Sequence, residues 1–313
     1  MYWVFFLALF GVGSGIAVAQ DSFSGEVLPL RLGDDTLLQR VIADARLYTE
    51  QWDTLPQLIF WRRVMNLPPD SAVISVAQTR QILGVIPLKR YESRSETGRT
   101  LFKDSLRTHH QLPPGSRIYI THGKNDFYSP RLVIPGISRA MDIFAAEGVD
   151  PWIAQAILLI ESPGAVRRSN KGAYGSFQLM KSVAISQGLV VNKYVDERED
   201  FDKCARAAAR FIRKVCIPET ERILAAHNLS WNRQELWFRL MVLHVYHAGA
   251  GNVGGVIGYI NPEEGGAALI QQIWRTEYGS FRNSSQNYSQ LALASMLELD
   301  LLVALECEVT CQP

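Results

Sequence analysis

The sequence lacks a strong net charge of either sign, because its 32 Lys and Arg side chains nearly balance its 31 Asp and Glu side chains and leave a net charge of +1. Nucleic acids and anionic membrane surfaces are bound mainly through an excess of basic side chains. We therefore expect no nucleic acid and no membrane surface as a partner, and a neutral or zwitterionic substrate fits this composition better. The hydrophobic fraction of 47% is large enough to bury a sizeable core.

Cysteine and histidine are also scarce, with four and six residues. None of the cysteines has CxxC spacing and the histidines show no zinc-ligand pattern, so we expect no metal and no cofactor. In an oxidising compartment two disulfides can form, and all three pairings stay open. The cysteines are Cys204, Cys216, Cys307 and Cys311.

Charged side chains are absent from residues 1–19. The apolar run from Tyr2 to Phe10, followed by Ala17-Val18-Ala19, is typical of a secretory signal peptide cut after Ala19. We predict that the mature chain begins at Gln20 and is exported to the periplasm or cell envelope. No Lys or Arg precedes the apolar run, which leaves an uncleaved anchor helix as the alternative, although the run is shorter than the ~20 residues of a membrane span. No later segment predicts a span.

Residues 20–130 carry helix and turn signals but no pattern that points to chemistry. Hydrophobic periodicity predicts three helices and one strand, with a charged stretch at 89–103 between them. The predicted helices are 37–48, 55–65 and 71–83, and the predicted strand is 117–121. We expect a smaller, mostly helical N-terminal region with little strand, and the sequence does not define its role.

Helical signals become dense after a proline-bounded segment at 130–135, which we interpret as a boundary. The chain beyond it, residues 135–305, predicts a mainly α domain. Asp150-Pro151 supplies an N-cap and a proline at the first helical position. The predicted helices are 137–147, 152–162, 201–215, 236–246 and 290–305.

The helix predicted at 152–162 is apolar nearly all round, so it should lie inside the domain. Glu161 ends it, one turn after Ile157 and Leu158. Desolvation by such neighbours raises a carboxyl pKa, as a general acid working near neutral pH requires. A glutamate at a helix end that points into water is the other interpretation, and this pattern alone does not decide between them.

Two further stretches have unusual composition. In the stretch 172–180, Gly172 and Gly175 permit a tight bend, and Gln178 can donate and accept hydrogen bonds, as an amide or a sugar hydroxyl requires. In the stretch 246–253, small residues follow Tyr246 and allow a bulky ligand to approach the backbone. Taken singly, each stretch also fits an ordinary loop or a glycine-rich helix end.

Together the three stretches resemble the catalytic domain of the soluble lytic transglycosylases, of the goose-type lysozyme-like superfamily. That family carries Glu-Ser at a helix end, then Gly-Ala-x-Gly-Leu-Met-Gln-Leu-Met, then Ala-Tyr-Asn-Ala-Gly. Glu161-Ser162, Gly172 to Met180 and Tyr246 to Gly249 stand in the same order here. The resemblance covers about residues 137–293 and implies a lysozyme-like helical catalytic domain.

The resemblance implies cleavage of the β-1,4 bond between N-acetylmuramic acid and N-acetylglucosamine in peptidoglycan, with formation of a 1,6-anhydro ring. Glu161 is then the catalytic acid and base, without a cofactor. The implied partners are glycan strands, with peripheral association with the cell wall. The residues that the resemblance assigns to substrate binding are Gln178, Met180, Tyr246, Ser169 and Tyr288.

The sequence departs from the family pattern at several positions. Ser176-Phe177 replaces Leu-Met, His247 follows Tyr246 in place of asparagine, and Ser284 stands where a glutamate is usual. The loop between Glu161 and Gly172 is one residue shorter. Two other functions therefore stay open, namely a hydrolase on the same scaffold and a non-catalytic protein that binds peptidoglycan or assists wall assembly.

Overall fold

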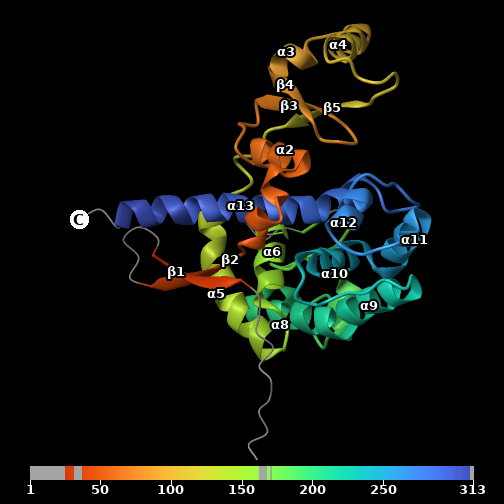
Figure 1. Cartoon of the computed structure of the whole chain (residues 1–313). Coiled ribbons are helices and arrows are strands. Elements are labelled where there is room, and N and C mark those ends of the chain that lie inside the picture. The colour runs from red at the N-terminus through yellow and green to blue at the C-terminus, as the bar shows by residue number, and fades with distance from the viewer. Residues whose placement is uncertain (1–24, 32–36, 162–167, 170, 311–313) are drawn as a thin grey trace, which may run out of the picture.

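The described part of the chain is mainly helical with two small antiparallel sheets, as expected from the sequence at this level (Figure 1). A computed structural model describes residues 25–31, 37–161, 168–169 and 171–310, the last four of these by their backbone alone. The predicted signal peptide at 1–19 lies outside these residues.

The elements follow one another in a fixed order, and each label is that of Figure 1 where it is drawn. They are β1 (Glu26–Arg31), β2 (Leu38–Ala43), α1 (Arg46–Thr49), η1 (Trp52–Thr54), α2 (Pro56–Met65), β3 (Ser71–Val76), β4 (Ile82–Pro87), α3 (Leu88–Glu92), α4 (Glu96–His109), β5 (Ile118–His122), α5 (Pro130–Ala146), α6 (Pro151–Glu161), α7 (Lys181–Ser186), η2 (Glu197–Glu199), α8 (Phe201–Phe211), η3 (Ile212–Cys216), α9 (Ile217–Ala226), α10 (Leu236–Ala248), α11 (Ala250–Ile260), α12 (Ala267–Ile273) and α13 (Asn283–Thr310).

Two helices, α6 and α13, form the centre of the helical body. The first ten residues of α6 are all buried, as its apolar sequence predicts. The long helix α13 crosses the body and packs against α2, α6 and α10 (Figure 1). Contrary to expectation, Asn283–Glu306 is long and apolar enough to span a membrane, but 61% of its most apolar window is buried inside the protein, as in a core helix.

The helix predicted at 37–48 is wrong over most of its length, because β2 pairs with β1 in an antiparallel hairpin. Val41 and Ile42 pack into the main core, against α5 and α6. The Gln155 side chain of α6 accepts a hydrogen bond from Ile42 N at 2.8 Å and donates one to Ile42 O at 2.7 Å. Contacts with residues more than a hundred positions away thus override the local helical pattern.

The helix predicted at 71–83 is also wrong. Its β-branched residues Val73, Ile74 and Val76 lie in β3, which is the central strand of the sheet β4-β3-β5. Branching at Cβ restricts side-chain rotation in a helix and suits a pleated strand. The strand predicted at 117–121 is confirmed as β5, and the stretch at 89–103 holds α3 and part of α4.

Residues 68–122 form a module that is inserted into the helical body, and we call it the β-sheet module. It has its own small core of Ala72, Ile74, Ile86 and Ile118, and it projects from the body in Figure 1. The chain enters and leaves the module at one place, because Lys124 N donates to Val64 O at 2.8 Å and Asn125 N to Leu67 O at 3.1 Å.

The other predicted helices are confirmed with shifted ends. The largest shifts at a start are in α5 and α13, which both begin seven residues earlier than predicted. Because α5 begins at Pro130, the segment 130–135 is helical and is not a boundary. Pro130 suits the first turn, where a backbone N–H has no helical partner. A buried ionic cluster fixes three elements to one another, since Arg239 of α10 lies 2.9 Å from Asp150, before α6, and 3.5 Å from Asp44, after β2.

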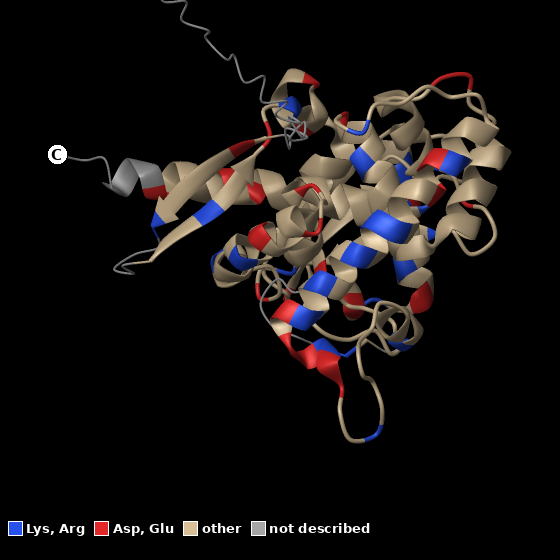
Figure 2. Ribbon diagram, turned by 90° about the horizontal axis from the view of Figure 1, so that it is seen from below, with Lys and Arg blue, Asp and Glu red and all other residues tan. Residues whose placement is uncertain are grey.

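Charges of both signs are interspersed over the underside of the body (Figure 2). On α8, Lys203 pairs with Glu197 at 2.7 Å and Arg210 with Glu147 at 3.0 Å. Cys204, on the opposite face of α8, and Cys216 of η3 are buried free thiols, so neither is in a disulfide. Burial raises the pKa of Cys204 to about 11.

Candidate functional site

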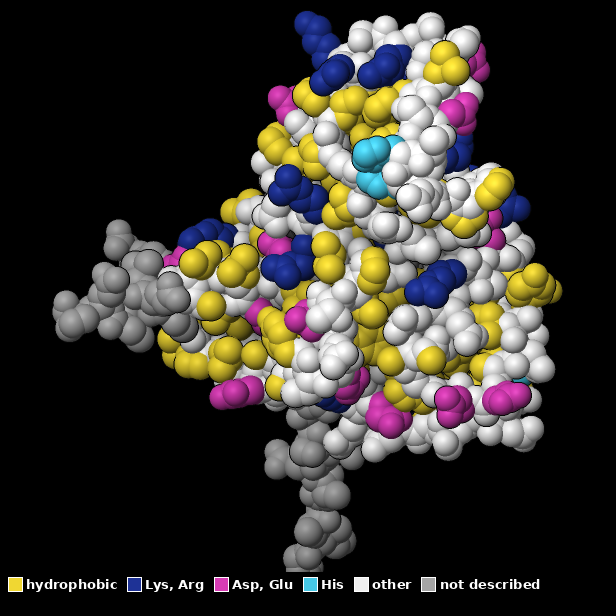
Figure 3. Space-filling model, turned by 45° about the horizontal axis from the view of Figure 1, so that its top comes forward, with side chains coloured by type: hydrophobic (Ala, Val, Ile, Leu, Met, Phe, Trp, Pro, Cys, Tyr) yellow, Lys and Arg dark blue, Asp and Glu magenta, His cyan; other side chains and the backbone are white. Residues whose placement is uncertain are grey.

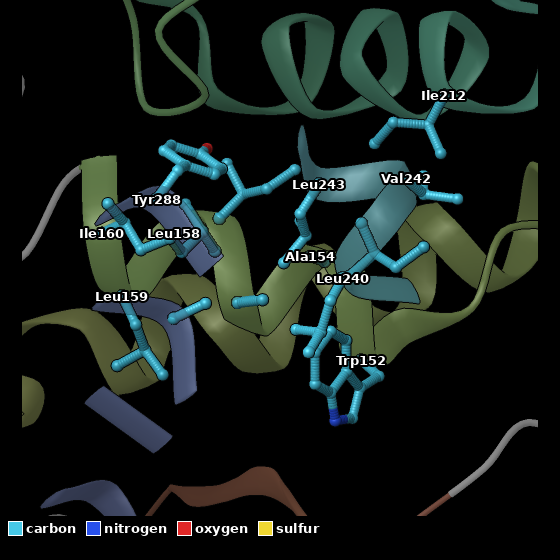
Figure 4. Close-up of a cluster of buried hydrophobic side chains, with 14 of the residues drawn as sticks. Trp152, Ala154, Leu158, Leu159, Ile160, Ile212, Leu240, Val242, Leu243 and Tyr288 are labelled. Atoms are coloured by element: carbon cyan, nitrogen blue, oxygen red, sulfur yellow. The ribbon is translucent and has the colours of Figure 1, made fainter. Parts of the chain in front are cut away.

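The candidate site begins at the last residue of α6. Asp150 caps the start of this helix by accepting a hydrogen bond from Trp152 N at 3.0 Å. Ten buried residues follow before Glu161, which retains some exposure. Figure 4 shows Leu158, Leu159 and Ile160 among the apolar side chains that surround this end of α6. The sequence thus places one carboxyl group at the edge of an apolar core.

Burial raises the pKa of Glu161 from its ordinary value to about 7, and a hydrogen bond from Tyr288 partly opposes that shift. Desolvation disfavours the charged form, which is why it dominates here. A carboxyl with this pKa is present in both protonation states near neutral pH. It can therefore give and take a proton under the same conditions.

Tyr288 of α13 is the residue in contact with this carboxyl. Its ring is 2% exposed and lies beside Leu158 and Ile160 (Figure 4). Its pKa is raised well above the ordinary value by burial and then by the charge of Glu161, so the hydroxyl stays protonated and acts as a donor. Within the described part of the chain, the Tyr288 hydroxyl has no hydrogen-bond partner of good geometry, and the Glu161 carboxyl is the nearest charge that shifts its pKa.

Tyr246 of α10 is also close enough to Glu161 for the two side chains to interact electrostatically. Its hydroxyl donates a hydrogen bond of 2.6 Å to Phe177 O, which links α10 to the glycine-containing stretch at 172–180. Its pKa is raised well above the ordinary value, first by burial and then by the charge of Glu161. Because the hydroxyl proton is already engaged, the Tyr246 oxygen is left to act as a hydrogen-bond acceptor.

A third tyrosine, Tyr128, was not predicted from the sequence. It comes from the segment between β5 and α5 and is half-buried. Its pKa is raised by burial and, to a smaller extent, by the charge of Glu161. Tyr128 and Leu159 also line an apolar cavity of about 290 Å³ between α2, α5 and α13. No sequence pattern around Tyr128 predicts that it lies near Glu161, because its position depends on the path of the segment before α5.

The stretch at 172–180 forms a tight loop that depends on one glycine. Gly175 has φ +83°, and a Cβ at this position would collide with Arg198 O and approach Cys204 Sγ to 2.8 Å. Gln178 also has a positive φ, of 47°, and its Nε2 donates to Gly175 O at 3.0 Å. Positive φ at a residue other than glycine is uncommon, and such strain gathers at binding and catalytic loops.

Arg198 holds this loop from beneath, and it too was not predicted. Its buried Nη1 donates to Gly172 O at 3.0 Å and to Leu179 O at 2.9 Å. Asp196 orients the guanidinium through hydrogen bonds of 2.8 and 2.7 Å and keeps it charged. Arg198 is therefore a positioning residue for the segment that carries Gln178.

The remaining predicted residues lie at the two ends of the same loop. Met180 is 43% exposed and precedes α7. Ser169 Oγ accepts from Ala173 N at 2.9 Å, which closes the other end. Among the described residues, neither contacts Glu161 directly. The shortened segment after Glu161, residues 162–167, lies outside the described residues.

Two histidines on α10 have different surroundings. The His247 ring stacks on Tyr288, with centroids 4.3 Å apart. The His244 ring is buried, and burial lowers its pKa to about 3, so it is neutral at physiological pH. Its Nε2 is 2.8 Å from Ser289 Oγ, which also accepts from Trp274 Nε1 at 2.7 Å. This chain joins three helical segments in the core and has no access to solvent.

The described residues thus define a mainly helical protein with one largely buried carboxyl group at a helix end, near three tyrosines. The structure brings together Glu161, Tyr246 and Tyr288, and it places Gln178 next to the residue that Tyr246 contacts. Comparison of this chain with models of protein families, with curated proteins and with solved structures gives no match. What the protein does must therefore be argued from the geometry of this site.

Proposed function

We propose that the protein is a peptidoglycan lytic transglycosylase that uses Glu161 as its acid and base. The observation that carries the proposal is the Glu161 carboxyl, whose pKa burial raises to about 7. Among the described residues, no second carboxylate influences that pKa. Most glycosidases need two carboxylates about the scissile bond, whereas an intramolecular attack by a substrate hydroxyl needs one group that gives and then takes a proton.

In the proposed reaction, protonated Glu161 donates its proton to the glycosidic oxygen between N-acetylmuramic acid and N-acetylglucosamine. The bond from that oxygen to the muramic C1 breaks. The resulting carboxylate then takes the proton from the muramic C6 hydroxyl, whose oxygen attacks C1 and closes the 1,6-anhydro ring. The carboxyl ends in its starting state, and no water is consumed.

Tyr288 and Tyr246 are the tyrosines that we expect to assist this reaction. Tyr288 donates toward the Glu161 carboxylate, which stabilises the ionised form after the first proton transfer. Tyr246 presents an oxygen as acceptor, and Gln178 presents an amide beside it, both suited to sugar hydroxyl and acetamido groups. We assign Met180 to the wall of the glycan groove and Ser169 to its far end.

We also propose that residues 135–305 form a lysozyme-like catalytic domain. We further propose that the protein loses residues 1–19 on export and works in the periplasm or cell envelope, in peripheral contact with the wall. Both rest on the motif order and the apolar N-terminal run, with the buried Glu161 as support from the structure.

A hydrolase on the same scaffold is the second candidate, because the same carboxyl can activate water. A non-catalytic peptidoglycan-binding or wall-assembly protein is the third, and the departures at Ser176-Phe177 and Ser284 favour it. The buried Glu161 carboxyl argues against this third candidate, since an ordinary surface glutamate needs no raised pKa.

The test is digestion of purified sacculi with the protein, followed by mass spectrometry of the product ends. Anhydro-muramic ends are expected. Reducing ends would identify a hydrolase and overturn the transglycosylase proposal. Strand binding without any cleavage would identify the non-catalytic alternative.

A further inference from the structure

A second, polar cavity of about 210 Å³ lies where the β-sheet module meets the body, and Glu161 is not among its lining residues. Lys and Arg side chains are visible on both sides of this junction in Figure 3. The cavity draws residues from both parts of the protein. Its lining includes Arg80, Arg117 and Tyr119 of the module and Trp274, Arg275, Glu277, Asn283 and Gln286 of the body.

Arg80 is the unusual member of this lining, because it is a buried cation without a carboxylate partner. It is 5% exposed, and its guanidinium lies 5.0 Å from the Phe60 ring centroid and 5.5 Å from that of Tyr119. Its Nη2 donates to Asn283 Oδ1 at 2.8 Å and to Asn287 Oδ1 at 2.9 Å. These acceptors are neutral, and within the described chain no Asp or Glu forms an ion pair with Arg80.

The rest of the cavity adds further positive charge. Arg117 and Arg275 line it, and the one lining carboxylate, Glu277, is engaged by Arg117 at 3.3 Å. The cavity also adjoins the N-terminus of α13, where a helix presents free N–H groups and the positive end of its dipole. A buried charge is normally balanced by an opposite charge, and here that counter-charge is missing among the described residues.

We propose that this cavity binds a small oxyanion, of which the carboxylate at the end of a peptide is the candidate that we favour. A guanidinium gives an oxyanion strong, charge-assisted hydrogen bonds. Arg80 Nη2 already donates to Asn283 and Asn287, so Arg80 offers an anion a single hydrogen bond from Nη1 together with its charge. Arg117 and Arg275 supply the other cationic donors of the lining. The volume accommodates one such group with a few attached atoms and no long ligand. This site is independent of glycan cleavage at Glu161.

Binding of an anion would also couple the two parts of the protein. Arg80 and Arg117 come from the β-sheet module, whereas Arg275 and Gln286 come from the body. A ligand held by both sets is bound by the folded protein alone and stabilises it by mass action. The same titration can therefore be followed as heat and as a rise in melting temperature.

The experiment is calorimetric titration of the full chain at low ionic strength with three probes. The probes are N-acetyl-alanyl-alanine, its C-terminal amide and inorganic phosphate. We expect saturable binding of the free carboxylate and no binding of the amide. Tighter binding of phosphate than of the carboxylate would support the oxyanion site but overturn the peptide source. Absence of saturable binding of both anions would overturn the proposal.

Variants separate the cavity from general surface charge. Arg275→Gln is expected to weaken binding at least about fivefold, because it removes an exposed lining cation without touching the core. Arg282→Gln is the matched control, since Arg282 is exposed near the start of α13 but does not line the cavity. Equal weakening by both variants would contradict the site. Arg80→Gln should abolish binding of the anion. If that variant does not fold, the double variant Arg117→Gln and Arg275→Gln is tested instead, and it too should lose binding.

Discussion

At the scale of single residues, the raised pKa of Glu161 is the property from which the proposed chemistry follows. Replacement of Glu161 by Gln removes proton donation and acceptance while keeping the side-chain shape. Each acid or base role contributes on the order of 10²- to 10⁴-fold, so cleavage should fall to near background. The products are measured by mass spectrometry. If Glu161→Gln still releases anhydro-muropeptides, Glu161 is not the catalytic acid and base.

The raised pKa of Glu161 also predicts how the stability of the folded protein changes with pH and with the Glu161→Gln substitution. The pKa of Glu161 is higher in the folded protein than the ordinary value of 4.5, so the folded state favours the neutral form. The native protein is therefore most stabilised below pH 4.5, and this stabilisation, up to about 3 kcal/mol, is lost as pH rises through about 7. Glu161→Gln should melt no lower than the parent at pH 8, and its advantage should shrink in acid. A variant that is inactive because it has unfolded would refute this reasoning.

Tyr288→Phe tests the hydrogen bond that opposes the shift. Without the Tyr288 hydroxyl, the Glu161 carboxylate loses a donor, so its pKa should rise further. The alkaline limb of the activity profile should move to higher pH, and the maximal rate should fall by about tenfold. Tyr278→Phe, at an exposed tyrosine, is the control and should leave the profile unchanged. An alkaline limb that moves to lower pH would show that Tyr288 does not donate to Glu161.

His247→Asn should retain appreciable activity. The His247 ring stacks on Tyr288 but forms no described hydrogen bond with the Glu161 carboxyl. Loss of one aromatic contact is worth about 0.5 to 1.5 kcal/mol, so a modest decrease in melting temperature is expected. Activity is measured on sacculi beside the parent. A loss as large as that of Glu161→Gln would give His247 a role in proton transfer.

The apolar surroundings of Glu161 could be predicted from the sequence, because its own helix supplies ten buried residues before it, whereas its role in catalysis stays a prediction. Tyr128 and Arg198 could not be predicted in this way. Tyr128 reaches the site through the path of the chain before α5, and Arg198 supports the loop from a segment that follows it. Both roles depend on tertiary placement, which a single sequence without an alignment does not reveal.

At the scale of elements, the loop at 172–180 supplies a matched pair of glycines. Both have a positive φ, of 86° at Gly172 and 83° at Gly175, but a Cβ at Gly172 meets nothing within 4 Å. Gly172→Ala should therefore cost the ~1 kcal/mol of left-handed backbone alone. Gly175→Ala adds a collision with Arg198 O, and we expect a loss of more than about 3 kcal/mol. Urea denaturation of both variants measures the difference, and equal losses would contradict this account of the loop.

Some helices and strands could be predicted from the sequence and others could not. The helices α6 and α10 could be predicted because each is a long, mostly apolar run, and the first ten residues of each are buried. The strands β2 and β3 were predicted as helices because short apolar runs fit both periods. Their pairing partners, β1 for β2 and β4 and β5 for β3, decide the outcome, and strand pairing is not a local property.

At the scale of the whole molecule, the adjacent ends of the β-sheet module predict that it can be removed. Deletion of residues 68–122, with a short glycine linker, should leave a body that still folds, because Val64 and Lys124 are already hydrogen-bonded. The body should melt at a lower temperature, since Val73 no longer packs against Phe60 and Trp61. Circular dichroism during heating measures this, and loss of a cooperative transition would contradict the separation.

Deletion of residues 25–66 is the contrasting control. It removes Val41, Ile42 and Leu58, which belong to the main core, and Asp44, which is paired with buried Arg239. Loss of one partner from a buried ion pair typically costs about 3 to 5 kcal/mol, in addition to the lost apolar contacts. This variant should not fold, and a folded product would show that β1, β2 and α2 are dispensable.

The central position of α13 also sets when this chain can fold during its synthesis. α13 packs against α2, α5, α6 and α10, all of which leave the ribosome before it does. Until residues 283–310 are made, these partners expose the apolar faces that α13 will cover, and non-local contacts of this kind form slowly. The segments made before α13 therefore cannot complete their packing until residues 283–310 are available, and their uncovered apolar faces are open to aggregation in the meantime.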